Sequence, residues 1–423
     1  MKLVNKSIIL TTSLLMSSYV TAKPPEPEPG KRWVLNNAYS DEFNGNSLDK
    51  TKWRDKHKSW RGRPPAIFDP KAVEINNGKL EITNSMLDKP DGKYTIAGGA
   101  VQSLNQTAYH GYYESRFKAS RINMSTTFWL SNDNIPFEGN NHLGQNCARD
   151  RWSMELDIVE AVGGVMDQSW TQSFRDGMQY NTHVWYSGCE KNSRNRFSKG
   201  ANVAEGDGTQ AFNNKLPKGE EVWQNYNTYA AWWKNENEVD FYLNDNFAGH
   251  IKVDTTLLAK PYNRPMQMQM LTETYDWGRP LPTAEELANK KINTSYYDWV
   301  RSYYYADVSE EVKQELPLSG TPADIFTESV QIKKVQFIAN KIAFSYLYES
   351  DEDVTAKISV IKDKETVLAK TVNLKAGYGH VEDTLELAFA AQFDNTNLVI
   401  KLYNQNNEKI TASKAYKLKL NVK

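Results

Sequence analysis

The sequence contains little cysteine and little net charge, and its interior has no long apolar run, so several classes of protein are excluded. Cys147 and Cys189 are the only cysteines among 423 residues, which excludes a disulfide-rich scaffold and a cysteine-rich zinc site. Because 51 Lys and Arg nearly balance 52 Asp and Glu, no excess of positive charge favours a nucleic-acid partner. The mean hydropathy of -0.67 excludes a polytopic membrane protein.

Residues 1–22 have the composition of a signal peptide. A basic start is followed by an apolar stretch, 8–20, that is shorter than the roughly 20 residues needed to span a bilayer. Ala22 supplies the small residue that precedes a signal-peptidase cut. We therefore expect an exported protein, extracellular or periplasmic, whose mature chain has no membrane span. Export permits a disulfide between Cys147 and Cys189, with two free thiols as the alternative.

The pattern of strands and turns divides the rest of the chain into two all-β units. The Pro-rich segment 23–31 is expected to be a stiff tether without core residues. In 32–306, short runs with period-two alternation are separated by Asn-Gly, Asp-Gly and Gly-Gly turns, which predicts a large β-sandwich. The polar, Pro-containing segment 307–322 predicts a linker. Residues 323–423 repeat the strand pattern without tryptophan, so we expect a small Ig-like β-sandwich that is separable from the first unit.

Aromatic residues, in contrast, are abundant. The chain holds 12 Trp and 23 Tyr, more than a core of this size needs, and surplus rings of these types usually line an open surface. Sugar rings stack on flat apolar faces that have hydrogen-bonding edges. The composition therefore favours a carbohydrate-binding surface.

The segment Met-Glu155-Leu-Asp157-Ile-Val-Glu160-Ala carries three carboxylates in a strand-like run. In a regular strand Glu155 and Asp157 share one face and Glu160 points to the other, but one bulge residue between 157 and 160 brings Glu160 back. Like charges so close together raise the pKa of at least one group. A protonated carboxyl beside an ionised one is the pair that retaining glycoside hydrolysis uses. The alternative is an exposed strand edge with scattered acids, which the apolar residues between them disfavour.

This segment matches the ExDxxE signature of glycoside hydrolase family 16, in the bulged form of enzymes that cut red-algal galactans. The resemblance extends over most of 33–305, through Ser40-Asp-Glu-Phe-Asn44, Phe128-Trp129-Leu130, Asn181-Thr-His183-Val and Asp298-Trp-Val-Arg301. It implies a β-jelly-roll sandwich with a concave cleft. It also implies that Glu155 is the nucleophile, that Glu160 is the acid/base, and that Asp157 orients and tunes the nucleophile.

The resemblance further implies a set of substrate-binding residues, namely Trp60, Trp129, His183, Glu273 and Trp277. The stretch Trp60-Arg-Gly-Arg63-Pro departs from the Trp-x-Gly-Pro-Gly pattern typical of agarases. Together with Arg149, which precedes the catalytic strand, Trp60 and Arg63 are similar to the residues that hold the sulfate of galactose 6-sulfate in β-porphyranases. Guanidinium groups suit sulfate oxygens. The alternative is ordinary surface pairing of these arginines with aspartate.

We therefore expect a monomeric, endo-acting and retaining hydrolase of β-1,4-galactosidic linkages in a sulfated red-algal galactan of the porphyran or agar type. The alternative substrate is furcellaran or κ-carrageenan, because the enzymes that cut them also have basic clefts. A non-catalytic galactan-binding protein is a remote alternative, since such proteins normally lose the carboxylates that are present here. The mechanism requires no cofactor. Members of the family often carry a structural Ca²⁺, although no segment here resembles a calcium loop.

Overall fold

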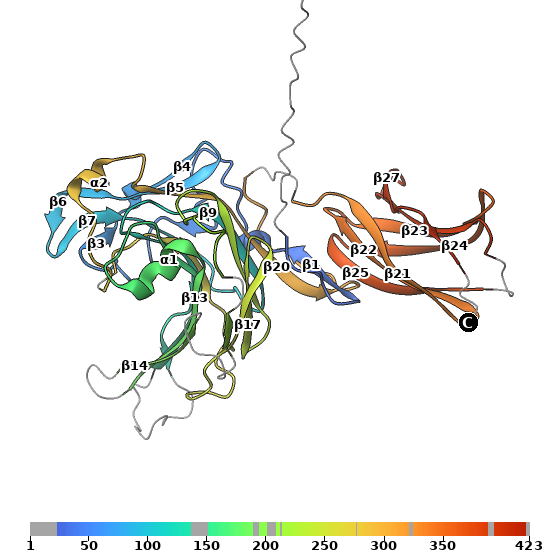
Figure 1. Ribbon diagram of the computed structural model, residues 1–423, viewed down its shortest axis with the longest axis horizontal. Helices are drawn as coiled ribbons and strands as arrows, with labels where there is room; N and C mark the ends of the chain where they lie inside the picture. Colours follow the sequence, from blue (N-terminus) through green and yellow to red (C-terminus); the bar gives the residue numbers. More distant parts are fainter. Residues whose placement is uncertain are drawn as a thin grey trace, which may run out of the picture.

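The structure is a computed structural model that describes residues 23–136, 151–188, 194–200, 209–211, 214–275, 277–320, 325–387 and 393–419. The described chain consists mostly of β-strands, which form two units side by side (Figure 1). The predicted all-β class is confirmed. Among the described residues, no helix is both long enough and apolar enough to cross a bilayer.

The first unit is a sandwich of two sheets, and the inner sheet is the one that carries the carboxylates. Its strand order is β14-β13-β12-β10-β19-β8-β2, with β11 beside β12. The bounds are β14 (Arg194–Gly200), β13 (Gln179–Ser187), β12 (Arg151–Val162), β11 (Ile135–Pro136), β10 (Ser125–Ser131), β19 (Gln267–Leu271), β8 (Ala100–Ser103) and β2 (Trp53–Arg54). Side chains alternate between the core and the outside along each strand, so every second residue is available to a cleft.

The outer sheet packs against the inner sheet and continues beyond it. In the first unit its order is β15-β18-β17-β16-β9-β20-β1, with β5 beside β20 and β4 beside β5. The bounds are β15 (Thr209–Ala211), β18 (Asn246–Lys252), β17 (Glu238–Leu243), β16 (Asn227–Trp233), β9 (Gly111–Lys118), β20 (Thr294–Asp307), β1 (Lys31–Leu35), β5 (Lys79–Thr83) and β4 (Val73–Asn76). Between the two sheets lies a core rich in aromatic residues, in which Tyr113, Phe117 and Phe241 are buried.

Short elements complete the first unit. They are β3 (Ala66–Phe68), β6 (Ser85–Asp91), β7 (Tyr94–Gly98), α1 (Ser173–Asp176), α2 (Ala284–Ala288), η1 (Asn37–Tyr39), η2 (Pro70–Ala72) and η3 (Ser169–Gln172). The sequence explains two of these features directly. Thr283 and Glu286 form a capping box at the start of α2. Asn77 and Gly78 adopt φ values of 49° and 70° between β4 and β5, a left-handed conformation that Asn and Gly tolerate in hairpin turns.

The second unit has two layers and its own core. One layer contains β21 (Ser329–Ile338), β22 (Lys341–Ser350) and β25 (Gly377–Glu386), and the other contains β23 (Val354–Lys362), β24 (Glu365–Leu374), β26 (Thr396–Tyr403), β27 (Lys409–Ala412) and β28 (Tyr416–Lys417). Ile342, Phe344, Ile358 and Ile400 are buried between the layers. The predicted strands of this unit are therefore present, and the Ig-like topology stays a prediction.

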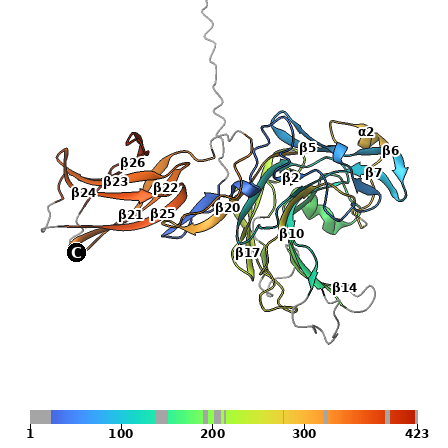
Figure 2. The same cartoon turned by 180° about the vertical axis from the view of Figure 1, so that it is seen from behind.

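The two units share one continuous sheet. In the second unit β25 pairs with β1, Tyr378 opposite Trp33, so the outer sheet runs from β15 to β21. An apolar cluster covers this seam, with Trp33, Tyr112 and Tyr303 from the first unit and Leu347 and Tyr378 from the second. Figures 1 and 2 show β1 and β20 where the two units join. The separability that the polar linker predicts stays a prediction, and the shared sheet and cluster show that each unit covers apolar surface of the other.

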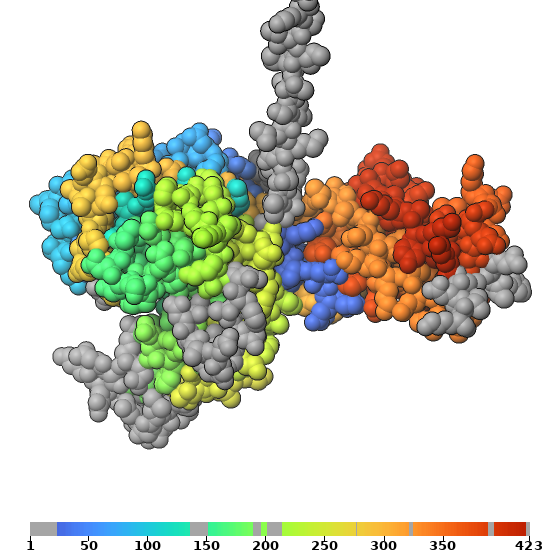
Figure 3. Space-filling model, in the orientation of Figure 1, coloured from blue at the N-terminus to red at the C-terminus, as the bar shows by residue number. Residues whose placement is uncertain are grey.

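The Pro-rich segment 23–31 lies in this seam instead of extending freely as a tether. Pro24 and Pro27 are buried, and the indole nitrogen of Trp33 donates a 2.7 Å hydrogen bond to the carbonyl of Pro25. Figure 3 shows the N-terminal residues, in blue, where the two units meet. The prediction that this segment contains no core residues is wrong, because Pro24 and Pro27 are buried where the two units meet.

Candidate active site

The three carboxylates of β12 are brought to one face by a bulge. Leu156 is fully buried in the core, so Glu155 and Asp157 on either side of it point outwards. In the pairing with β10, Ile158 has no partner, and in the pairing with β13 the register shifts between Asp157 and Glu160. The predicted bulge is therefore confirmed. It returns Glu160 to the face that carries Glu155 and Asp157.

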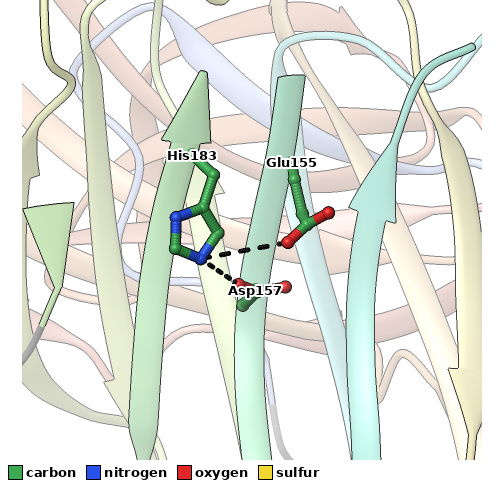
Figure 4. Close-up of side chains that lie close together, drawn as sticks. All are labelled: Glu155, Asp157 and His183. Atoms are coloured by element: carbon green, nitrogen blue, oxygen red, sulfur yellow. Dashed lines mark ion pairs between the residues drawn. The ribbon is translucent and has the colours of Figure 1, made fainter. Parts of the chain in front are cut away.

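His183 connects two of these carboxylates. It lies opposite Glu155 on β13, and its Nε2 is 3.0 Å from Oδ2 of Asp157 and 3.9 Å from Oε1 of Glu155 (Figure 4). Its Nδ1 is 2.5 Å from the hydroxyl of Ser198 on β14. A neutral His183 with its proton on Nε2 therefore donates to Asp157 and accepts from Ser198. The indole nitrogen of Trp185 donates to Oε2 of Glu155 at 3.2 Å.

Glu160 is held by a different pair of donors. The amide nitrogen of Asn181 on β13 is 2.9 Å from Oε2 of Glu160. The hydroxyl of Tyr275, which follows β19, donates to Oε1 at 2.8 Å. Both oxygens of Glu160 thus have a neutral donor, which fixes the orientation of the carboxyl group.

The pKa values of Glu155 and Asp157 are raised above their ordinary values. Burial, together with the nearby Asp157 charge, raises the pKa of Glu155 to about 7. Burial and Glu160 raise the pKa of Asp157 well above its usual range. Burial also lowers the pKa of His183, so the imidazole is neutral at neutral pH. The expectation that clustering raises at least one carboxyl pKa agrees with this geometry, and burial makes the largest contribution.

The same residues have the composition of a metal-ligand group. Glu155, Asp157 and His183 each offer a ligand atom, and these atoms lie within 4.8 Å of one another. The contact of 3.0 Å between His183 and Asp157 already uses two of them. Hydrolysis by paired carboxylates needs no metal ion. The absence of a required cofactor stays a prediction, as does a structural Ca²⁺.

Arg63 contacts a second buried carboxylate at the edge of the site. Its Nε is 3.1 Å from Oε2 of Glu273, and its guanidinium lies 5.3 Å from the centre of the Tyr275 ring. Burial raises the pKa of Glu273 to about 8, which outweighs the attraction of Arg63. The 3.1 Å contact therefore does not require a fully charged pair, because a protonated Glu273 can still share a hydrogen bond with Arg63.

The aromatic residues predicted to bind sugar occupy two places. Trp60 and Trp129 are partly buried against a small cluster of Phe68, Ala100 and Leu271, with the rings of Trp60 and Phe68 at 5.0 Å. Trp277 stacks on Tyr275 with the ring centres 4.3 Å apart. The structure thus places Trp277 against Tyr275, whose hydroxyl contacts Glu160, and Trp129 next to Asp157 through its strand register.

Three predicted residues lie outside the described part of the chain. They are Arg149, Cys147 and Cys189, so both the second sulfate-binding arginine and the disulfide stay predictions. Conversely, Asn181, Trp185 and Tyr275 contact the carboxylates but are absent from the predicted set. Asn181 and Trp185 lie two residues before and after His183 on β13, so strand alternation predicts that all three share one face. Tyr275 follows a different strand, and its position depends on packing.

Comparison with known proteins identifies the class. Residues 33–305 match the family described as β-porphyranase A–D, glycoside hydrolase family 16 domain. The chain is 42% identical over 287 residues to β-porphyranase E of Zobellia galactanivorans, covering 66% of this chain and 91% of that relative. It is 35% identical over 376 residues to β-porphyranase D of the same organism, covering 86% and 83%. The crystal structure of a β-porphyranase from Bacteroides plebeius matches with a TM-score of 0.61 and 37% identity, covering 67% and 96%.

These findings define the protein as a glycoside hydrolase with a jelly-roll catalytic unit, as the sequence predicts. The chain belongs to glycoside hydrolase family 16, in its β-porphyranase A–D group. The match to β-porphyranase D is longer than the catalytic unit, so it extends beyond the jelly roll itself.

Proposed function

We propose that this protein is an exported, retaining endo-hydrolase that cuts β-1,4-galactosidic linkages in a sulfated red-algal galactan of the porphyran type. The observation that carries the proposal is the bulge in β12, which gathers Glu155, Asp157 and Glu160 on one face. The names of the relatives support the substrate class. The signal-like segment 1–22 supports export.

In the first step, the ionised Glu155 attacks the anomeric carbon while a protonated Glu160 gives its proton to the glycosidic oxygen. The bond to the leaving sugar breaks and a covalent glycosyl ester forms on Glu155. In the second step, Glu160 accepts a proton from water, which attacks the ester and regenerates Glu155. Two inversions at one carbon give net retention.

The neighbours of these carboxylates match the two roles. The indole N–H of Trp185 donates to Glu155, which stabilises negative charge on the nucleophile. Asn181 and Tyr275 hold Glu160 in a fixed orientation, which suits a group that must meet one oxygen of the substrate. Asp157 holds the tautomer and position of His183.

The sulfate is recognised by Arg63, with Arg149 as its predicted partner. Glu273 contacts Nε of Arg63, which orients the guanidinium, and a planar guanidinium suits sulfate oxygens. A neutral galactan would not need the partly buried Arg63 held against the buried Glu273 at the edge of the site.

Product analysis on a panel of substrates tests the proposal. The full-length protein is incubated with porphyran, agarose, κ-carrageenan and furcellaran, and products are sized over time. We expect rapid loss of polymer length on porphyran with a ladder of oligosaccharides, the pattern of an endo-enzyme. Cleavage of agarose alone would contradict sulfate recognition. Cleavage of κ-carrageenan or furcellaran alone would move the protein to the carrageenan-type alternative, and no reducing-end release from any polymer would favour a binding protein.

Stereochemistry and two variants test the mechanism. NMR of the first products should show the β-anomer, and initial appearance of the inverted anomer would contradict retention. Glu155→Gln and Glu160→Gln should each reduce kcat by several orders of magnitude, roughly 10³-fold or more. Glu74→Gln provides a matched control, because Glu74 is an exposed carboxylate on β4 of the outer sheet. Circular dichroism should show that all three variants fold.

A further inference from the structure

The loop that follows β12 carries an exposed tryptophan. All twelve tryptophans lie within the described residues, and Trp170 in η3 is the one whose side chain is exposed, at 53%. Val165 on the same loop is 61% exposed. Tryptophan is highly buried on average, so a half-exposed indole beside a second exposed apolar residue indicates a surface that makes contacts with another molecule.

Trp170 is the outer end of a row of aromatic rings that begins at Glu160. Tyr275 donates its hydroxyl to Glu160, and its ring stacks on Trp277 with centres 4.3 Å apart and planes at 16°. The Trp277 ring lies 5.0 Å from that of Trp170, and Phe174 supports both from one side. The row therefore leads from the proton-donating carboxyl to the open surface.

The loop that carries Trp170 is anchored to the segment that carries Trp277. The side-chain nitrogen of Asn123 donates to the carbonyls of Val165 and Pro280, each at 2.8 Å. The backbone N–H of Asp167 donates to the carbonyl of Arg279 at 2.7 Å. At Gly164, an added Cβ would lie 2.0 Å from Oδ1 of Asn123, so this close approach needs glycine. A fixed aromatic surface loses little conformational entropy when it binds a ligand.

The small core under the loop does not require an indole at 170. A cluster of four buried residues lies there, made of Val162, Met166, Phe174 and Tyr275. One side of Trp170 contacts this cluster through Trp277 and Phe174, and the remaining half of its surface faces outwards.

We propose that Trp170 forms an outer subsite, beyond the sugars that flank the scissile bond, in which a hexose ring of the galactan stacks on the indole. This inference rests on the proposed function, because it takes the galactan as the ligand. Stacking uses the apolar face of the sugar ring and requires no sulfate. The subsite therefore contributes to binding of long chains whatever their sulfation at that position.

Binding of oligosaccharides of graded length tests the subsite. Glu155→Gln serves as the parent, because it should bind without cutting, and calorimetry measures Kd for porphyran oligosaccharides from the disaccharide upwards. Adding Trp170→Ala should raise Kd for long oligosaccharides about three- to tenfold, with a smaller increase for the shortest ones that bind. Adding Trp170→Phe should restore much of the affinity, because a ring remains.

Val367→Ala in the same background is the control, since Val367 is an exposed apolar residue on β24 of the second unit, outside the proposed surface. It should leave Kd unchanged at every length. Equal affinity of the Trp170→Ala protein and its parent for long oligosaccharides would overturn the subsite, and so would an equal loss at all lengths. A parent that binds no porphyran oligosaccharide would instead show that the proposed substrate is wrong, and the subsite as proposed would fall with it.

Discussion

The hydroxyl of Tyr275 donates a 2.8 Å hydrogen bond to Oε1 of Glu160. The ring of the same tyrosine lies under the guanidinium of Arg63 and stacks on Trp277. One side chain thus connects the acid/base carboxyl, the arginine proposed to bind sulfate, and the aromatic row that ends at Trp170. Changes at these sites are therefore coupled through Tyr275, and measurements on one of them need controls on the others.

Tyr275→Phe should lower kcat on porphyran by about tenfold, because one hydrogen bond to a carboxyl group is lost while the ring remains. KM should change little, since the contacts of the ring with Arg63 and Trp277 are kept. Steady-state kinetics on a soluble oligosaccharide measure both constants. Tyr296→Phe, a partly exposed tyrosine of β20 in the outer sheet, is the control. An unchanged kcat in Tyr275→Phe, or the same loss in Tyr296→Phe, would contradict a positioning role.

The pH dependence of kcat/KM should have an acid limb near pH 7. Glu155 must be ionised to attack, its pKa is raised to about 7, and activity is therefore lost as pH falls below that value. The N–H of Trp185 stabilises the ionised form and so lowers this pKa. Trp185→Phe removes the N–H, which should move the acid limb to higher pH.

Profiles of kcat/KM from about pH 5 to about pH 9 measure this shift. Trp223→Phe is the control, because the Trp223 indole donates to Glu221 and none of the three carboxylates of β12. An acid limb that stays in place or moves to lower pH in Trp185→Phe would refute this assignment of the limb to Glu155.

Arg63→Ala should lower kcat/KM on porphyran by roughly 10- to 100-fold, because one or two charge-assisted hydrogen bonds to the substrate are lost. The loss on chemically desulfated polymer should be much smaller. Arg63→Lys should recover only part of the activity, since lysine keeps the charge but lacks the planar fork. Arg61→Ala is a matched control from the same loop, because Arg61 is exposed and pairs with Asp91. Equal losses of Arg63→Ala on both polymers would rule out a sulfate contact.

Strand alternation and one bulge are enough to predict the position of the three carboxylates, because both rules act within a few residues of β12. The same alternation on β13 contains Asn181 and Trp185 beside His183. Tyr275 could not be predicted in this way, since its contact with Glu160 depends on where the segment after β19 packs. The pairing of β1 with β25 could not be predicted from the sequence either. Strands that pair across such a distance in the chain leave no local pattern in the sequence. The prolines at the seam have the same sequence pattern as those of an ordinary linker.

Glu114 makes the stability of the protein depend on pH. This carboxyl of β9 is fully buried opposite Arg301. Burial, with a smaller contribution from the Asp245 charge, raises its pKa to about 8 despite the attraction of Arg301. The folded protein thus keeps a proton that the unfolded chain loses above its usual pKa of 4.5. The free energy of unfolding should fall as pH rises between these values, by up to roughly 5 kcal/mol.

Glu114→Gln removes this titration, so its Tm should match that of the wild type near pH 5 and exceed it at about pH 8.5, roughly by 5 °C or more. Thermal unfolding across this range provides the measurement. Glu74→Gln should keep the wild-type pH dependence, because this carboxylate is exposed on β4. Parallel curves for the wild type and Glu114→Gln would show that Glu114 does not titrate in this window.

Removal of the second unit should destabilise the first without blocking its cleft. A fragment of residues 31–308 would expose Trp33 and Tyr303 of the seam cluster, and it would leave β1 with an unpaired edge where β25 had been. Exposure of large aromatic side chains costs about 2 kcal/mol each, so Tm should fall by roughly 5–10 °C. The carboxylates lie on the inner sheet, away from the seam, so hydrolysis of soluble oligosaccharides should persist at low temperature.

Full-length Tyr416→Ala, altered at an exposed residue of the second unit, should keep the wild-type Tm. A fragment as stable as the full chain would show that the shared sheet adds nothing to the stability of the catalytic unit.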